Sequence, residues 1–179
     1  MTLTESSKAK LIAIARKALE AVLAGQPPPP VEVSGKEFEE QRGVFVTLKK
    51  GKDLRGCMGC FSSTRPLAET VQEMALSSAL HDPRFPSLIR NELRDVTLEI
   101  SILSPLWKIR EIDEIVMGEH GILIEKEGRS GCFLPQVAEE TGWTREQFLG
   151  HCARDKAGLG WEGWKNADIS VFTVESIEE

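Results

Sequence analysis

Residues 43–59 read Gly-Val-Phe-Val-Thr-Leu-Lys-Lys-Gly-Lys-Asp-Leu-Arg-Gly-Cys-Met-Gly, and they predict a β-hairpin. An apolar run (43–48) is followed by a basic turn and then by a second strand that starts near residue 54. Side chains two apart on a strand face the same way, so we expect Arg55 beside Cys57. A guanidinium beside a thiol favours the nucleophilic thiolate, and Gly56 and Gly59 allow close approach of a ligand or another backbone. The same pattern also fits a tight hairpin with a buried structural cysteine.

The remaining pattern mixes helices and strands. Helical spacing of apolar residues covers 4–23, 67–80 and 144–156, and Thr144 with Gln147 matches a capping box. Alternating patterns predict strands at 97–103, 121–125, 132–137 and 168–176, with a turn at 128–131. Hairpins require antiparallel pairing, so the sequence predicts an α+β fold with helices packed on a mainly antiparallel sheet.

Size and charge limit the possible classes of protein. The 179 residues suit a single domain (1–179), in which the proline-rich stretch 26–30 is a stiff connector. The net charge of −6 makes non-specific nucleic-acid binding a weaker hypothesis, although Lys49, Lys50, Lys52 and Arg55 form a basic strip. No apolar run is long enough to span a membrane, so we expect a cytoplasmic protein whose four cysteines are reduced thiols.

Cysteine spacing does not predict a metal site or a cofactor. Cys57 and Cys60 are three residues apart on a strand and should point to opposite faces, and no second close pair accompanies them. The sequence contains no phosphate-binding glycine loop, no zinc-protease signature and no cysteine triad for an iron–sulfur cluster. We therefore expect no cofactor.

Other residues are candidates for binding a ligand, and each also has an ordinary structural interpretation. Asp82, Arg84 and Phe85 lie in a segment bounded by prolines and either line the site or have local roles, in which Asp82 caps a turn, Phe85 packs and Arg84 pairs locally. Glu99 sits among aliphatic residues of a strand, and it either binds a ligand, lies on the polar face of a half-covered sheet or pairs with an arginine such as Arg55. Ser130 and Gly131 either offer backbone donors to an anion or form an ordinary hairpin turn.

Several separated motifs together resemble one family. They are Gly-Val-Phe-Val-Thr-Leu (43–48), Leu-Arg-Gly-Cys-Met-Gly (54–59), Asp-Pro-Arg-Phe-Pro (82–86), Leu-Glu-Ile-Ser-Ile-Leu (98–103), Gly-Ile-Leu-Ile (121–124), Arg-Ser-Gly (129–131), Leu-Pro-Gln-Val (134–137) and Lys-Ala-Gly-Leu (156–159). In this order they resemble the AMMECR domain family, whose microbial members are called protein A of the AmmeMemoRadiSam system. The signature of that family falls on residues 54–59, with Met58 where isoleucine is usual.

The resemblance implies a larger and a smaller subdomain with a cleft between them, and two partners: a Memo-like protein and a radical SAM protein. It implies no settled reaction. Our leading hypothesis is an enzyme or enzyme component that uses Cys57 in the cleft for group transfer or hydrolysis, with Arg55 holding an anion or stabilising the thiolate. The alternatives are a non-catalytic adaptor that binds a partner or small ligand in the cleft and, less favoured, a nucleic-acid-binding regulator.

Overall fold

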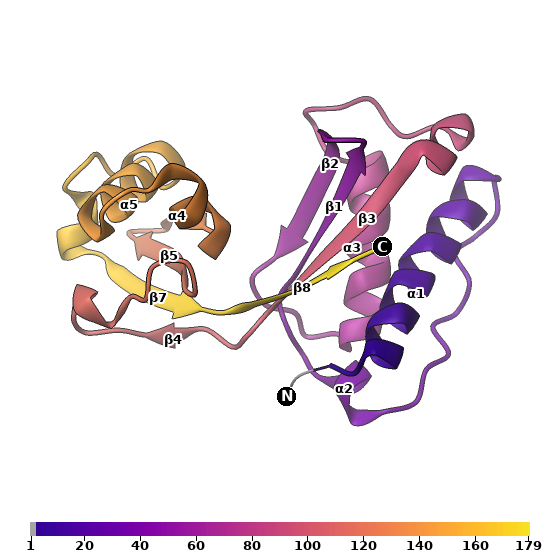
Figure 1. Cartoon of the computed structure of the whole chain (residues 1–179), viewed down its shortest axis with the longest axis horizontal. Coiled ribbons are helices and arrows are strands. Elements are labelled where there is room, and N and C mark those ends of the chain that lie inside the picture. The colour runs from indigo at the N-terminus through magenta and orange to yellow at the C-terminus, as the bar shows by residue number, and fades with distance from the viewer. Residues whose placement is uncertain (1–2) are drawn as a thin grey trace. The chain divides into compact units, whose positions relative to one another are not determined.

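The computed structural model describes residues 3–179, which divide into two compact units (Figure 1). Unit 1 contains the described chain up to Leu103 together with Glu175–Glu179, and unit 2 contains Ser104–Val174. Unit 2 is therefore inserted into the sequence of unit 1. The cleft expected between two subdomains stays a prediction.

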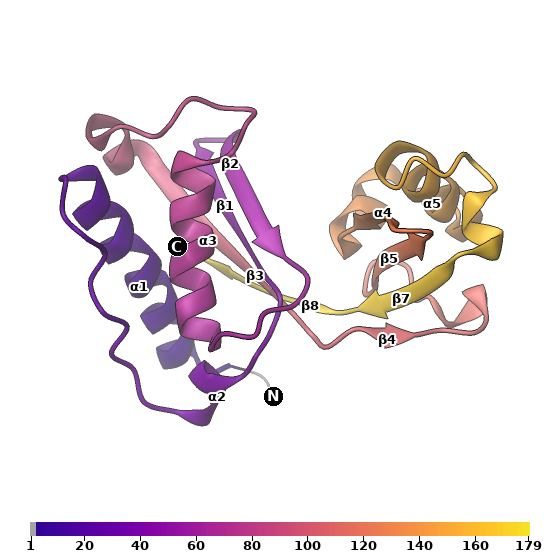
Figure 2. The same ribbon diagram turned by 180° about the vertical axis from the view of Figure 1, so that it is seen from behind.

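Unit 1 packs helices on a four-stranded sheet (Figures 1 and 2). The strands lie in the order β2-β1-β3-β8, and α1 and α3 pack against each other and against the sheet. In chain order the elements are α1 (Glu5–Leu23), α2 (Lys36–Glu39), β1 (Val44–Lys50), β2 (Asp53–Cys60), α3 (Leu67–Leu80), the 3-10 helix η1 (Arg90–Asp95), β3 (Val96–Leu103) and β8 (Val174–Glu178). This arrangement confirms the predicted α+β class.

The predicted hairpin forms β1 and β2, and its alternation separates two faces of the sheet. Val44, Val46 and Leu48 are completely buried in a core shared with α1 and α3. The residues between them, including Thr47, point to the opposite face and are half-buried. One face of the sheet is thus covered by helices, while the other carries both Phe45 and Thr47.

A β-bulge interrupts the hairpin within the signature. Leu48 pairs with Gly56, but the next residue, Lys49, pairs with Leu54, so Arg55 stands opposite no residue of β1. The alternation on which the predicted Arg55–Cys57 pair rested therefore does not hold at this point.

Unit 2 has its own four-stranded sheet, in the order β4-β7-β5-β6, and its own apolar core. Its elements are β4 (Trp107–Lys108), η2 (Ile112–Glu114), β5 (Gly121–Lys126), β6 (Arg129–Phe133), α4 (Pro135–Thr141), α5 (Arg145–His151), the π-helical turn η3 (Cys152–Lys156), η4 (Gly163–Asn166) and β7 (Asp168–Phe172). The capping box at Thr144 is confirmed, since its hydroxyl accepts from the Gln147 N–H and the Gln147 amide accepts from the Thr144 N–H.

Three sequence-based boundaries in unit 2 were wrong. The turn lies at Glu127 and Gly128, both with positive φ, so β6 begins at Arg129 instead of after a turn at 128–131. Pro135 is the first residue of α4, where a proline fits because its missing N–H would be unbonded anyway. The predicted strand 168–176 is two strands, β7 and β8, that belong to different sheets.

The proline-rich stretch 26–30 forms no helix or strand and connects α1 to α2. The Gln72 side-chain amide on α3 donates to the Pro29 carbonyl at 2.9 Å, which ties the stretch to unit 1. No helix within residues 3–179 is both long and apolar enough to cross a membrane.

Candidate functional site around Cys57

Cys57 lies in β2, the edge strand of the unit 1 sheet, on the face away from α1 and α3. It pairs with Thr47, and its own N–H and C=O bond to side chains instead of β1. Pairs without ladder hydrogen bonds bring their side chains closer together. The Thr47 hydroxyl accordingly donates to the Cys57 Sγ at 3.3 Å. Cys57 is a free, half-buried thiol with a hydroxyl donor on its sulfur.

Asp82 and Arg84 fasten the outer edge of Cys57. The Asp82 carboxylate accepts from the Cys57 N–H at 2.8 Å, and Arg84 Nη2 donates to the Cys57 carbonyl at 3.0 Å. The two side chains also bind each other, with Arg84 Nε and Nη2 donating to Asp82 at 2.9 and 2.7 Å. Asp82 and Arg84 therefore pair with each other, and the pair also contacts Cys57, the predicted nucleophile.

Burial differs sharply between the two partners. The Asp82 side chain is 1% exposed, whereas the Arg84 side chain is 54% exposed. Hydrogen bonds from Arg84 outweigh burial and, with backbone N–H donors, hold the pKa of Asp82 well below its usual range. Hydrogen bonds to Asp82 raise the pKa of Arg84, and an electrostatic interaction with Cys57 adds to that rise. Arg84 therefore places a positive charge next to Cys57.

Arg55 is engaged elsewhere. Its Nε and Nη2 donate to the Glu92 carboxylate at 3.1 and 3.0 Å, and its Nη1 donates to the Pro86 carbonyl at 3.0 Å. This fork-like pair holds the pKa of Glu92 below its ordinary value. Arg55 fastens the loop between α3 and β3, the loop that carries Arg84.

The two signature glycines make room for protein atoms. A Cβ at Gly56 would collide with the backbone carbonyl of Ser78 on α3, and a Cβ at Gly59 would collide with the Phe45 ring. Gly56 therefore allows a helix to approach the strand directly. The Ser78 hydroxyl accepts from the Met58 N–H at 2.9 Å and lies 2.7 Å from the Val46 carbonyl, so the same helix is bonded to both strands of the hairpin.

Glu99 lies next to this site on β3, opposite Thr47. It forms an ion pair with Lys49 instead of Arg55, which agrees with a structural role. Lys49 and Arg55 are both paired with carboxylates, so the predicted basic strip is partly neutralised.

Ser130 and Gly131 belong to unit 2 and lie within β6. A Cβ at Gly131 would collide with the backbone of η3, so this glycine allows the π-helical turn to pack on the strand. The sequence-based argument that they bind an anion assumed that they form a turn, and they lie in a strand instead.

The other cysteines differ from Cys57 in their surroundings. Burial raises the pKa of Cys132 to about 12 and raises that of Cys152 further still. Both belong to unit 2, while Cys60 ends β2 as a half-buried free thiol. Within residues 3–179, no three His, Cys, Asp or Glu side chains gather in a way that could hold a metal ion.

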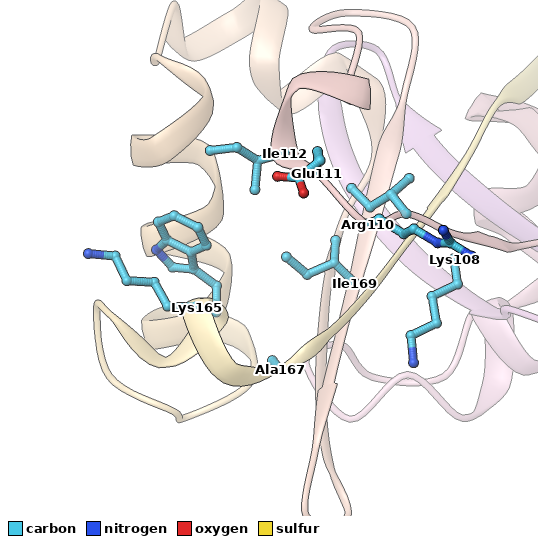
Figure 3. Close-up of a pocket in the computed structure, with 9 residues that line it drawn as sticks. Lys108, Arg110, Glu111, Ile112, Lys165, Ala167 and Ile169 are labelled. Atoms are coloured by element: carbon cyan, nitrogen blue, oxygen red, sulfur yellow. The ribbon is translucent and has the colours of Figure 1, made fainter.

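A separate small pocket lies in unit 2 (Figure 3). It has a volume of about 130 Å³, with apolar walls that include Ile109, Trp164 and Ile169. Lys108 at its rim pairs with Asp168 at 2.5 Å. Lys165 also lines the pocket, and the pocket was not predicted from the sequence.

Sequence reasoning missed Thr47, Ser78 and Glu92. Thr47 could have been predicted, because a residue that pairs with Cys57 across a hairpin lies on the same face of the sheet. Ser78 and Glu92 could not have been predicted from the sequence, since their roles depend on how α3 and η1 pack.

Comparison with known proteins supports one family. The AMMECR1 family model matches residues 12–177. Protein MK0488 of Methanopyrus kandleri is 37% identical, over 93% of this chain and 84% of its own length. A protein of Thermococcus onnurineus is 39% identical, over 94% of this chain and 88% of its own length. The crystal structure of the uncharacterized protein PH0010 from Pyrococcus horikoshii has a TM-score of 0.85 and 36% identity, and the match covers 94% of this chain and 89% of PH0010.

Proposed function

The chain belongs to the AMMECR1 family, and from this premise we propose that it is an enzyme, or a component of one, with the Cys57 thiol as its reactive group. The observation that carries the proposal is the pair of donors at this residue. The Thr47 hydroxyl bonds to the sulfur, and the guanidinium of Arg84 is fixed beside Cys57 by a buried carboxylate. Both kinds of group stabilise negative charge on sulfur, as a cysteine nucleophile requires.

The proposed reaction is group transfer or hydrolysis through a cysteine adduct. The sulfur of Cys57 forms a bond to an electrophilic carbon, and the leaving group departs with the electrons of the bond that breaks. A second acceptor or water then takes the group and restores the thiol. Within residues 3–179, the other half-buried thiols, Cys60 and Cys132, have no such hydroxyl donor.

The remaining signature residues are proposed to position this site. Arg55 fastens the loop that carries Arg84, and Gly56 and Gly59 let α3 and an aromatic ring pack against the hairpin. Ligand contacts by Glu99, and by Ser130 and Gly131 of unit 2, remain part of the proposal. From the resemblance alone, we also propose that the chain acts with a Memo-like protein and a radical SAM protein, and that the radical chemistry belongs to the latter.

Site-resolved alkylation of the folded protein tests the proposal. Iodoacetamide is applied across a pH series, and the modification at each cysteine is read by mass spectrometry. We expect Cys57 to react in the folded state and Thr47→Val to slow it several-fold. Thr97→Val, a substitution on an exposed position of the same sheet, should leave the rate unchanged. A Cys57 that reacts only after unfolding contradicts the proposal.

An adaptor is the second candidate, because apolar side chains are exposed near the signature. Leu54 is 42% exposed and Ile89 is 59% exposed, next to Arg55 and its partner Glu92 respectively. Exposed apolar anchors are typical of protein interfaces. Calorimetric titration with a purified Memo-like protein tests the interface: we expect binding to be lost with Leu54→Asp and kept with Cys57→Ser.

A further inference from the structure

The exposed end of Arg84 suggests what kind of molecule reaches Cys57. Two of its three guanidinium nitrogens, Nε and Nη2, are bound to Asp82, and Nη2 also reaches the Cys57 carbonyl. Within residues 3–179 the third nitrogen, Nη1, donates to no backbone or carboxylate oxygen, and the side chain is 54% exposed. Both hydrogens of Nη1 are therefore available to a ligand.

The guanidinium is also held in place. Asp82 is buried and accepts from the Arg84 backbone N–H at 3.0 Å as well as from its side chain, so one carboxylate fixes both ends of this residue. The guanidinium carbon lies 5.5 Å from the centre of the Phe85 ring, which adds a cation–π contact. A donor fixed in this way loses little conformational freedom when it binds an anion.

The charges around the thiol are arranged asymmetrically. On the β1 and β3 side of Cys57, beyond Thr47, lies the carboxylate of Glu99, which is already paired with Lys49. On the outer edge lies Arg84, whose partner carboxylate is buried beneath it. The outer edge therefore offers an anionic group an exposed cation whose carboxylate partner is fully buried, whereas both members of the pair across the sheet are partly exposed.

We propose that Cys57 takes electrophiles that carry an anionic group, a carboxylate or a similar oxyanion, and that Nη1 of Arg84 binds this group next to the reacting carbon. The inference rests on the proposed function, because it assigns a substrate class to the same thiol. It also gives Arg84 a role beyond fastening the strand edge.

Paired alkylating probes test this directly. Iodoacetate and iodoacetamide differ mainly in one negative charge. With either, the Cys57 sulfur bonds to the CH₂ carbon, the carbon–iodine bond breaks, iodide leaves with the electron pair, and the thiol proton goes to solvent. The ratio of the two rates at Cys57 is measured by mass spectrometry and divided by the ratio for N-acetylcysteine in the same buffer. We expect a normalised preference for iodoacetate of about five- to tenfold, the size of one charge-assisted hydrogen bond at a partly exposed site.

Variants then locate the preference. Arg84→Gln should abolish it, whereas Arg94→Gln, which removes a well exposed arginine of η1, should preserve it. Because loss of Arg84 leaves a buried carboxylate unpaired, the unmodified protein provides a second test. Added sodium sulfate should slow iodoacetate at Cys57 more than it slows iodoacetamide.

The outcomes separate the two proposals. If both probes modify Cys57 but the normalised ratio is one, or sulfate slows them equally, the anionic substrate class is overturned and the nucleophile stands. If neither probe modifies folded Cys57, both proposals fall together. If the preference also disappears in Arg94→Gln, it comes from the general surface charge and Arg84 is not its source.

Discussion

Asp82→Asn removes a negative charge from the interior of unit 1 and leaves an amide of the same size. The carboxylate accepts four hydrogen bonds: from the Cys57 N–H and from the backbone N–H, Nε and Nη2 of Arg84. An amide has one oxygen where the carboxylate has two, and its NH₂ group opposes the donors that remain.

The expected cost follows from burial. Breaking a fully buried ion pair costs about 3–5 kcal/mol. Arg84 is 54% exposed, so water can solvate it once the charge of Asp82 is gone, and part of that cost is recovered. We therefore expect Asp82→Asn to lower the free energy of unfolding of unit 1 by about 2–3 kcal/mol at pH 7.

The location of the tryptophans makes this measurable. All four, Trp107, Trp143, Trp161 and Trp164, belong to unit 2. When urea unfolding is monitored by far-UV circular dichroism, the signal includes the loss of the long helices of unit 1. Tryptophan fluorescence instead reports the unfolding of unit 2. We expect Asp82→Asn to shift the circular dichroism transition to lower urea and to leave the fluorescence transition nearly unchanged.

The pH dependence has a defined sign. The folded-state pKa of Asp82 lies below the unfolded value of about 3.9, so its stabilisation is present above that value and fades as the pH falls through the folded pKa. The difference between wild type and Asp82→Asn should shrink as the pH falls below about 4. Asp155→Asn is the control, because Arg154 and His151 also hold the pKa of Asp155 low but this carboxylate is on the surface. Equal effects of the two substitutions, or a pH-independent difference, would refute the reasoning.

Three further predictions concern packing and thiol reactivity. Ser78→Ala should lower the stability of unit 1 by about 1–3 kcal/mol in urea unfolding, because the Met58 N–H loses its partner; no loss would mean that Met58 has another acceptor. Gly131→Ala should destabilise unit 2 by about 1–3 kcal/mol, read by fluorescence, since a Cβ collides with η3. Cys132 should alkylate on the order of 10³-fold more slowly than an ordinary thiol at neutral pH, since burial raises its pKa to about 12, and Cys152 more slowly still; fast labelling of either would show that unit 2 opens.

The hairpin, the helices and the fold class were predictable because local patterns determine them. Period-two alternation identified β1, and period-3.6 spacing identified α1 and α3. The break between β7 and β8 was not predictable, because both strands share one continuous alternating pattern and differ only in the sheet they join.

Part of the candidate site could be predicted from the sequence. Cys57, Asp82 and Arg84 were all identified as candidates, and the structure brings them together. The guanidinium at the thiol was expected from Arg55 and comes from Arg84. A bulge leaves Arg55 without a partner on β1, and its side chain bonds to Glu92 and Pro86 instead. Nothing in the local composition marks a bulge at that position.

The insertion of unit 2 between β3 and β8 has a consequence for biosynthesis. Chains are made from the N-terminus, and the sheet of unit 1 lacks its last strand until Val174–Glu178 has left the ribosome. All of unit 2 is synthesised before that moment. The nascent chain therefore holds β1, β2 and β3 with the edge of β3 open while the later unit forms. β8 then closes that edge, so a nascent chain that stops before Val174 leaves the edge of β3 exposed to other nascent chains.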